Sequence, residues 1–379
     1  MTKRLTEQQA LKYWESDLLL LAHYAHEVRL EKNPGNKVTF VVDRNINYTN
    51  ICISRCKFCA FFRPGGHKEA YVLNYETIKK KIKELAQQNG TQLLIQGGLN
   101  PDIKLDYYVS LFKNIKKDFK NINIHSLSPP EIDFISKNEK LSVKEVLITL
   151  KQAGLDSLPG GGAEILVDRV RQIMSPNKTD SDTWLKIMES AHEIGMKTTA
   201  TMVFGGIETL EERLEHLFKI RDLQDKTGGF TAFIPWTLQT KNTVLEKIPL
   251  NLHLSSHLTL PSPPAGEGKM GEKEINTISQ NIQKVTGIEY LKMLALSRLV
   301  LDNIPHIQVS YVTQGAKLAQ IGLFWGADDF GGTMLEENVV RACDVDFKLT
   351  KEEIIQNIKS AGFIPVQRDT YYNKLIVLS

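Results

Sequence analysis

Three of the chain's four cysteines lie close together, as Cys52, Cys56 and Cys59, with the spacing C-x3-C-x2-C. Thiolate sulfur is a soft ligand, and iron–sulfur clusters are held by it. Three thiolates on one short loop can bind three irons of a cubic [4Fe–4S] cluster, whereas a complete protein set would be four. The spacing therefore predicts a cluster with one iron left open to bind a second molecule.

Other interpretations of these cysteines stay open on the spacing alone. A structural zinc needs four ligands, and His67 could be the fourth, although the spacing matches no common zinc knuckle. An electron-transfer iron–sulfur protein would need a fourth protein ligand, which the cysteine loop lacks. The fourth cysteine, Cys343, is expected to be a lone structural thiol. The spacing favours the cluster with an open iron.

Composition limits the class of protein. With 42% hydrophobic and 24% charged residues, the 379-residue chain is expected to be globular with a large core. A net charge of +3 is too small to indicate nucleic-acid binding. No run approaches the roughly eighteen apolar residues of a membrane span, and the first residues lack the layout of a signal peptide. Because the cysteines do not form a disulfide framework, we expect a reducing, cytoplasmic location.

An alternation of strands and helices follows two leading helices, which are expected within residues 5–31. Eight such alternations predict an α/β fold, a parallel (β/α)8 TIM-type barrel, rather than an open sheet. The strands are expected at residues 38–43, 92–96, 122–126, 155–158, 198–204, 230–235, 307–312 and 326–330.

The chain is expected to divide into N-terminal helices packed on the barrel (1–36), the barrel itself (37–345) and a C-terminal helical extension (346–379). The extension holds one amphipathic helix that ends at Gly362. Residues 250–275 interrupt the alternation and are rich in Ser, Pro and Gly. We interpret them as a disordered surface loop, with an active-site lid as the alternative.

In a barrel of this kind the loops after the strands meet at one face, and the chemistry takes place there. The first expected strand leads into the cysteine loop, and the second leads into Gln96, Gly97 and Gly98. The remaining strands are followed by further polar residues and glycines, among them His125, Ser128, Glu164, Thr313, Gln314, Asp328 and Asp329. These positions predict a site at the carboxyl ends of the strands.

The cysteine motif, with Phe58 before its last cysteine, resembles that of the radical S-adenosylmethionine (SAM) enzymes. The resemblance implies that the amino and carboxylate groups of SAM chelate the open iron. One electron from the cluster would then cleave SAM to methionine and a 5′-deoxyadenosyl radical. Gln96, Gly97 and Gly98 match the place where this family binds the methionyl amine through backbone groups.

Further segments narrow the resemblance. SPPEI at 128–132, PGGGAEI at 159–165, VTQG at 312–315 and DFGGTMLEENVV at 329–340 are similar to those of the cyclic dehypoxanthine futalosine synthases, a radical SAM family of menaquinone biosynthesis. The similarity covers roughly residues 15–375 except the 250–275 insert. It implies hydrogen abstraction from the ribose C4′ of dehypoxanthine futalosine, attack of that carbon on the benzoate ring, and loss of one electron and one proton. The aminofutalosine synthases of the same pathway share PGGGAEI and remain an alternative.

The resemblance assigns roles to individual residues. It implies that Cys52, Cys56 and Cys59 ligate the cluster. Cofactor contacts are expected from Phe58, Phe61, Gln96, Gly97, Gly98, Ser128 and Glu164, although the aromatic rings could simply pack and Glu164 could cap a helix.

The substrate carries a carboxylate and sugar hydroxyls, so its pocket needs a cation and neutral hydrogen-bonding groups. The candidates are Arg44, Arg63, Arg169, Thr313 and Gln314, and each arginine could equally form a surface ion pair. His125, Asp328 and Asp329 are candidates for the base that takes the final proton. An electron donor such as flavodoxin or ferredoxin is implied, and a homodimer is left open.

Overall fold

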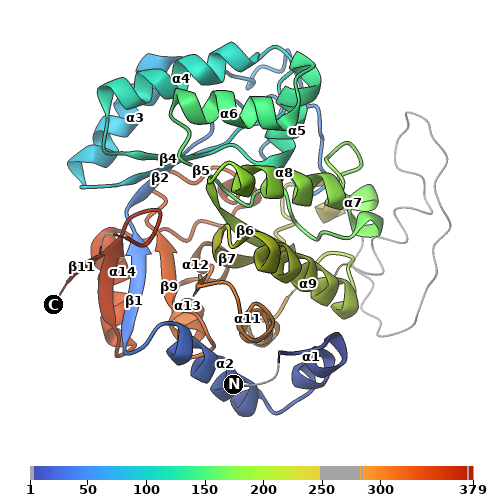
Figure 1. Ribbon diagram of the computed structural model, residues 1–379, viewed down its shortest axis with the longest axis vertical. Helices are drawn as coiled ribbons and strands as arrows, with labels where there is room; N and C mark the ends of the chain where they lie inside the picture. Colours follow the sequence, from blue (N-terminus) through green and yellow to red (C-terminus); the bar gives the residue numbers. More distant parts are fainter. Residues whose placement is uncertain (1–3, 248–281, 283–284, 374, 379) are drawn as a thin grey trace.

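The computed structural model describes residues 4–247, 282, 285–373 and 375–378 (Figure 1). The predicted insert at 250–275 lies outside the described residues. Within the described part, no helix is long and apolar enough to cross a membrane.

In the part of the chain that the structure describes, eight parallel strand segments form the barrel, with residues 37–46 counted as one segment. The segment 37–46 contributes both β1 (Lys37–Val41) and β2 (Asp43–Ile46), and β2 begins a seven-stranded parallel sheet that runs in chain order to β8. At the other side β9 (Asp329–Gly332) pairs with β1 and is joined to the β8 segment by a bridge between Gln308 and Asp329. The ring is thereby closed, which confirms the predicted TIM-type fold. The remaining strands are β3 (Gln92–Ile95), β4 (Asn123–Ser126), β5 (Ser157–Leu158), β6 (Lys197–Phe204), β7 (Phe230–Thr237) and β8 (His306–Ile307).

Helices cover the outside of these strands, and several begin and end at the residues that favour such ends. α6 (Val143–Ala153) starts with a capping box at Ser142 and ends at Gly154 in the left-handed conformation. α9 (Leu210–Thr227) likewise starts with a capping box, at Thr209, and ends at Gly228 in the left-handed conformation. The other outer helices are α3 (Tyr75–Gln87), α4 (Leu105–Asp118), α5 (Pro129–Glu139), α7 (Asp168–Met174), α8 (Ser181–Glu193), α11 (Gly287–Val300) and α13 (Ala316–Gly322) (Figure 1). At the N-terminus, α1 (Glu7–Trp14) and α2 (Leu18–Lys32) pack against α9 and α11.

The strand expected at 307–312 is wrong in its second half. β8 ends at Ile307, and Tyr311–Gln314 form a short helix, α12, which ends where Gly315 N–H donates to Tyr311 O at 2.7 Å. The β-branched and aromatic residues of this run resemble a strand in sequence. The tertiary contact of Ser310 N–H with the Tyr290 hydroxyl, 2.7 Å away, holds the chain out of the ladder. Helices α5 and α7 were not predicted.

The C-terminal extension contains the predicted helix, α14 (Lys351–Ser360), and two strands that the sequence did not indicate. β10 (Ile364–Arg368) pairs in parallel with β1, and β11 (Leu375–Val377) pairs with β10. The extension therefore adds its strands to the sheet edge formed by β1, beside the barrel (Figure 1).

The last two residues of β10 and the residues that follow them cross the amino-terminal end of the barrel. Gln367 Nε2 donates to Asn89 O before β3 at 3.2 Å, and the Tyr371 hydroxyl donates to Asp156 O before β5 at 2.8 Å. The Tyr372 ring stacks on His306 at the start of β8, with centroids 3.6 Å apart. Because these partners precede three different strands, the segment 367–372 lies across the end of the barrel opposite the cysteine loop.

Candidate active site

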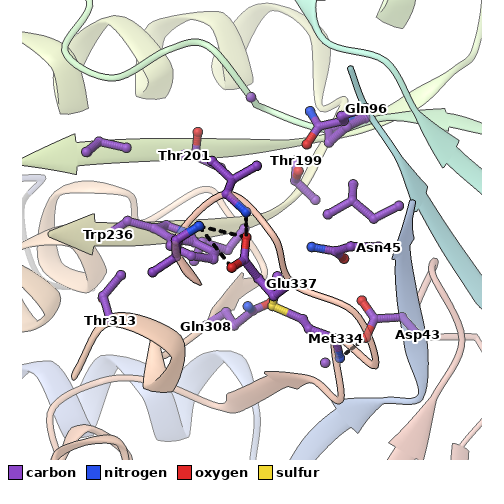
Figure 2. A pocket seen from close by; sticks show the side chains of 18 of the residues that line it. Asp43, Asn45, Gln96, Thr199, Thr201, Trp236, Gln308, Thr313, Met334 and Glu337 are labelled. Carbon is purple, nitrogen blue, oxygen red and sulfur yellow. Dashed lines mark hydrogen bonds between the residues drawn. The ribbon is translucent and has the colours of Figure 1, made fainter. Parts of the chain in front are cut away.

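A cavity of about 330 Å³ lies inside the barrel. Successive side chains of a strand point to opposite faces, so alternate residues line the interior. Several of them are small or polar, unlike the bulky branched residues that usually fill such a barrel. The lining includes Asp43, Asn45, Asn47, Gln92, Leu94, Gln96, Thr199, Thr201, Val203, Ala232, Ile234 and Trp236, many of which are seen in Figure 2.

The two ends of the cavity are lined by different parts of the chain. Its upper end is lined by Phe58, Gln96, Gly161 and Glu164, which follow the carboxyl ends of strands. Its floor is lined by His125 of β4 and by Arg368, Thr370 and Tyr372 of the C-terminal segment. A molecule in this cavity can therefore contact both the loops of the site and the C-terminal extension.

The cysteine loop is tied to the residues that follow β3. Cys52 N–H donates to Arg63 O at 3.1 Å, and Ile53 N–H donates to Leu99 O at 3.0 Å. Leu99 N–H in turn donates to Cys52 Sγ at 3.3 Å. N–H groups directed at sulfur are among the features that tune iron–sulfur clusters. The Arg63 guanidinium donates to Ala60 O and Phe62 O, and so stabilises the same loop.

Burial favours the protonated form of two of the three cysteines in the absence of a positively charged centre. Burial raises the pKa of Cys59 to about 11, and the neighbouring Cys56 thiolate adds to this. Burial also raises the pKa of Cys56, against the charge of Lys178. Binding to iron would supply the positive charge that these thiolates lack. The described residues contain no group of three His, Cys, Asp or Glu side chains arranged for one metal ion, so ligation of a cluster by these cysteines stays a prediction.

Glycine is required at both positions after Gln96. A Cβ on Gly98 would lie 2.2 Å from Ile51 O, and a Cβ on Gly97 would lie 2.6 Å from the Tyr48 ring. These distances are shorter than any normal contact, so the β3 exit approaches the cysteine loop only because side chains are missing. The glycines thus let backbone groups reach the upper end of the cavity.

A buried carboxyl group, Glu131, supports this turn and was not among the predicted site residues. Glu131 Oε1 accepts from Gly97 N–H at 3.1 Å and from the Tyr48 hydroxyl at 2.8 Å, and Oε2 accepts from Ser128 Oγ at 2.6 Å. Burial raises the pKa of Glu131 to about 7, although these hydrogen bonds oppose the shift. Ser128, predicted to touch the cofactor, is bound to Glu131 and does not line the cavity. Glu131 is part of the segment SPPEI, but the burial of its side chain, which marks it as a site residue, cannot be recognised in the sequence.

Glu164 lies at the upper end of the cavity with one carboxylate oxygen unused. Its Oε1 accepts from Lys178 Nζ at 2.8 Å, whereas Oε2 is buried without a hydrogen-bond partner among the described residues and lies 3.7 Å from Arg171 Nη1. The Lys178 ammonium also lies 5.5 Å from the centroid of the Phe58 ring. Phe58 and Gln96 line the same cavity, whereas Phe61 does not. An unused acceptor beside an aromatic ring suits a ligand that carries hydroxyl or amino donors.

The predicted substrate arginines lie outside the cavity lining. Arg44 pairs with Glu84 and Glu336, Arg63 pairs with Glu69, and Arg169 pairs with Glu212. Thr313 does line the cavity, and the adjacent Gln314 donates to Thr237 Oγ1 at 2.6 Å. No substrate contact is tested for any of these five residues, so their roles stay predictions.

The three predicted bases occupy different surroundings. His125 lines the cavity and shares a hydrogen bond of 2.6 Å with Ser157. Burial, with the charge of Arg368, lowers the pKa of His125 to about 3, so the neutral imidazole accepts a proton only weakly. Asp328 pairs with Arg298 and His306, and Asp329 pairs with Arg368. Neither aspartate lines the cavity, and both are engaged in buried ion pairs.

Two further carboxyl groups, which were not predicted, face the cavity. Asp43 Oδ1 accepts from Met334 N–H at 2.8 Å, and burial raises the pKa of Asp43 to about 6. Glu337 accepts from the N–H groups of Val340 and Arg341 at 2.9 and 3.0 Å, and burial raises its pKa as well. Figure 2 shows the carboxylate of Glu337 near the centre of the view and that of Asp43 on the right. The period-two pattern of Asp43, Asn45 and Asn47 could have indicated the first of them.

Comparisons with known proteins agree with this architecture. Two family models match, "Radical SAM superfamily" over residues 46–220 and "CofH/MqnC C-terminal region" over residues 269–378. Among solved structures, methylornithine synthase (PylB) has a TM-score of 0.68 at 16% identity, covering 96% of this chain and 95% of that chain. The hydrogenase maturase HydG of Carboxydothermus hydrogenoformans has a TM-score of 0.69 at 18% identity, covering 98% and 78%. Both support the fold.

Curated relatives are much more similar in sequence. Cyclic dehypoxanthine futalosine synthase of Halalkalibacterium halodurans is 43% identical over 98% of this chain and 91% of its own length. The synthase of the same name from Streptomyces coelicolor is 39% identical, over 99% and 86%. The 5-amino-6-(D-ribitylamino)uracil–L-tyrosine 4-hydroxyphenyl transferase of Methanococcoides burtonii is 38% identical, over 98% and 96%. The chain therefore belongs to the radical SAM superfamily and, within it, to the family that includes the cyclic dehypoxanthine futalosine synthases.

Proposed function

We propose that this enzyme converts dehypoxanthine futalosine into its spirocyclic product by joining the sugar C4′ to a carbon of the benzoate ring, a step of menaquinone biosynthesis. The observation that carries the proposal is the 43% identity to the Halalkalibacterium halodurans synthase over 98% of the chain. Of the segments on which the resemblance rested, VTQG and DFGGTMLEENVV contribute residues to the cavity lining, among them Thr313 and Glu337, whereas SPPEI contributes Glu131, which accepts from Gly97 N–H.

Cys52, Cys56 and Cys59 would hold the [4Fe–4S] cluster, with Leu99 N–H directed at the first of these sulfurs. Backbone groups of Gly97 and Gly98 and the free oxygen of Glu164 would bind SAM. When bound, the reduced cluster and SAM would together supply a 5′-deoxyadenosyl radical, which would remove a hydrogen atom from the sugar. The buried barrel interior would exclude water from the carbon radical until the ring closes.

The rest of the cavity suits a substrate with an aromatic ring and a sugar. Its volume of about 330 Å³ falls within the range of small-molecule sites. Trp236 offers an aromatic face, and Asn45, Thr199 and Thr201 offer neutral hydrogen-bonding groups to hydroxyls. Of the predicted candidates for the final proton, His125, Asp328 and Asp329, we retain His125, because it lines the cavity whereas both aspartates are held in buried ion pairs.

A second candidate is the transferase reaction, because that relative is 38% identical over 98% of this chain. The aminofutalosine synthase alternative has no comparable support from the relatives described above. The electron donor, such as flavodoxin or ferredoxin, a homodimer and the division at residues 36 and 345 also stay proposals.

Anaerobic assays of the reconstituted enzyme separate the candidates. Reductant and SAM are combined with dehypoxanthine futalosine in one reaction, and with tyrosine and 5-amino-6-(D-ribitylamino)uracil in another. We expect 5′-deoxyadenosine and a product two hydrogens lighter than the substrate only in the first reaction. Product in the second reaction alone would replace the cyclase with the transferase.

A further inference from the structure

We propose that Arg368 and Thr370, on the floor of the cavity, bind the carboxylate of the substrate's aromatic acid. This inference rests on the proposed function, which supplies a substrate with a benzoate group. Neither residue was predicted from the sequence, and both belong to the C-terminal segment that crosses the end of the barrel.

Arg368 is the only arginine or lysine among the described residues that line the cavity. It is 5% exposed. A guanidinium has five N–H donors, and three of them are used: Nε and Nη2 donate to Asp329, and Nη1 donates to Asp369 O at 3.1 Å. One N–H on each terminal nitrogen has no further hydrogen bond to the described residues. Two free donors on one planar group can serve the two oxygens of a carboxylate.

Asp329 fixes the position of Arg368, and none of its own acceptor positions is left free to bind a ligand in the cavity. Its Oδ2 accepts from Thr39 Oγ1 at 2.6 Å and from Arg368 Nε. Its Oδ1 accepts from Gly331 N–H at 2.8 Å and from Arg368 Nη2 at 3.1 Å. All four lone-pair directions of this carboxylate are therefore occupied. Asp329 is a positioning residue, which orients the guanidinium and shares its own charge with two other donors.

Thr370, two residues after Arg368, supplies a free hydroxyl to the lining of the same cavity. It is 7% exposed, and its Oγ1 is buried without a hydrogen-bond partner among the described residues. A buried hydroxyl without a partner is costly, and a ligand that accepts its proton removes that cost. Asp43 also lines the cavity, with a pKa that burial raises to about 6. A second carboxylate nearby favours its protonated form, which is a further donor.

The position of this site matches the proposed reaction. The floor lies at the end of the cavity opposite the cysteine loop, because Arg368 ends β10 and Thr370 follows it at the amino-terminal end of the barrel. A substrate held there by its carboxylate extends its sugar toward Glu164 and Phe58 at the upper end. The sugar carbon that loses hydrogen is then directed toward SAM.

Binding without turnover tests the inference. Isothermal titration calorimetry with the SAM-loaded, unreduced enzyme compares dehypoxanthine futalosine with an analogue in which hydrogen replaces the carboxylate. We expect the wild type to bind the carboxylate about tenfold to a hundredfold more tightly, the value of charge-assisted hydrogen bonds. The Arg368→Gln/Asp329→Asn double variant, which leaves no unpaired buried charge, should lose most of this preference and keep at most the several-fold part that Thr370 supplies. Thr370→Val should reduce the preference several-fold.

The surface supplies a matched control. Arg4 forms an exposed bidentate pair with Asp302, at 2.8 and 2.7 Å. Arg4→Gln/Asp302→Asn removes the same groups away from the cavity and should keep the full preference. A preference that survives undiminished in both floor variants, or its absence in the wild type, overturns the inference. If the wild type binds neither ligand and makes no cyclised product, the proposed function fails and this inference with it.

Discussion

The upper end of the cavity and its floor differ in the kind of contact that holds them together. At the upper end, Ser128 and Glu131 are 3 residues apart, and Leu99 and Cys52 are 47 apart. At the floor, Thr39 reaches Asp329 across 290 residues. The upper end depends on backbone groups and missing side chains, whereas the floor depends on buried ion pairs. Each end should therefore respond to a different kind of substitution.

Cys56→Ala should have the largest effect, because it removes one of three proposed cluster ligands. We expect loss of the broad visible absorbance of the reconstituted cluster and of 5′-deoxyadenosine formation. Absorption spectra and iron and sulfide analysis of the anaerobic protein provide the measurement. Cys343→Ser is the matched control for the spectrum, because this fourth thiol is engaged with Gln239 O. A Cys56→Ala protein with the full cluster content would refute the ligand role.

Glu131→Gln should change how stability depends on pH. The pKa of Glu131 is about 7 in the folded protein, against 4.5 for an ordinary glutamate. The folded state therefore holds more protons between these values, and the stability from the neutral carboxyl, fully present below pH 4.5, is lost as pH rises to 7. The loss is about 3 kcal/mol at most.

Denaturant unfolding from pH 4.5 to 8 measures this, as the difference between wild type and variant. Because Asp43 and the other buried groups are present in both proteins, their effect on the pH dependence of the unfolding free energy cancels in this difference. Glu31→Gln, on the exposed surface of α2, is the control and should follow the wild type. Parallel curves for wild type and Glu131→Gln would contradict a neutral, buried Glu131.

Gly98→Ala tests whether the close contact between the β3 exit and the cysteine loop requires glycine. Its Cβ would lie 2.2 Å from Ile51 O, so the β3 exit must separate from the cysteine loop at a cost of about 1–3 kcal/mol. We expect lower cluster occupancy and weaker SAM binding. Gly65→Ala is the control, because nothing lies within 4 Å of its Cβ. Unchanged stability in Gly98→Ala would mean that the two segments are not in close contact.

Tyr371→Phe should have the smallest effect and should act on the floor alone. It removes the bond to Asp156 O, worth about 0.5–1.5 kcal/mol. Thermal unfolding should detect the loss, while the cluster absorbance stays unchanged. Tyr75→Phe is the control away from the cavity: it removes the hydroxyl that contacts Asn114 O at 2.8 Å and Asp118 Oδ2 at 2.6 Å, and it should leave substrate affinity unchanged. Cluster loss in Tyr371→Phe would show that the two ends are not independent.

The parts of the site that could be predicted are those whose partners are near in sequence. The cysteine spacing, the glycines after β3 and the end of α6 at Gly154 each follow from residues a few positions apart. The roles of Arg44 and Arg169 could not be judged in this way, since their partners Glu336 and Glu212 are 292 and 43 residues distant. A charged residue after a strand looks the same in sequence whether it faces a cavity or pairs outside it.

By itself, the sequence determined the barrel, through its alternation of strands and helices, and the cysteine loop at the end of the first strand. Only the tertiary structure decided which alternate residues line a cavity, that Glu131 is buried behind Gly97, and that Arg368 lies on the floor. The physical reason is that spacing and capping act within a few residues of the chain. The floor exists because β10 pairs with β1, more than 300 residues earlier, where Lys37 lies opposite Ile364.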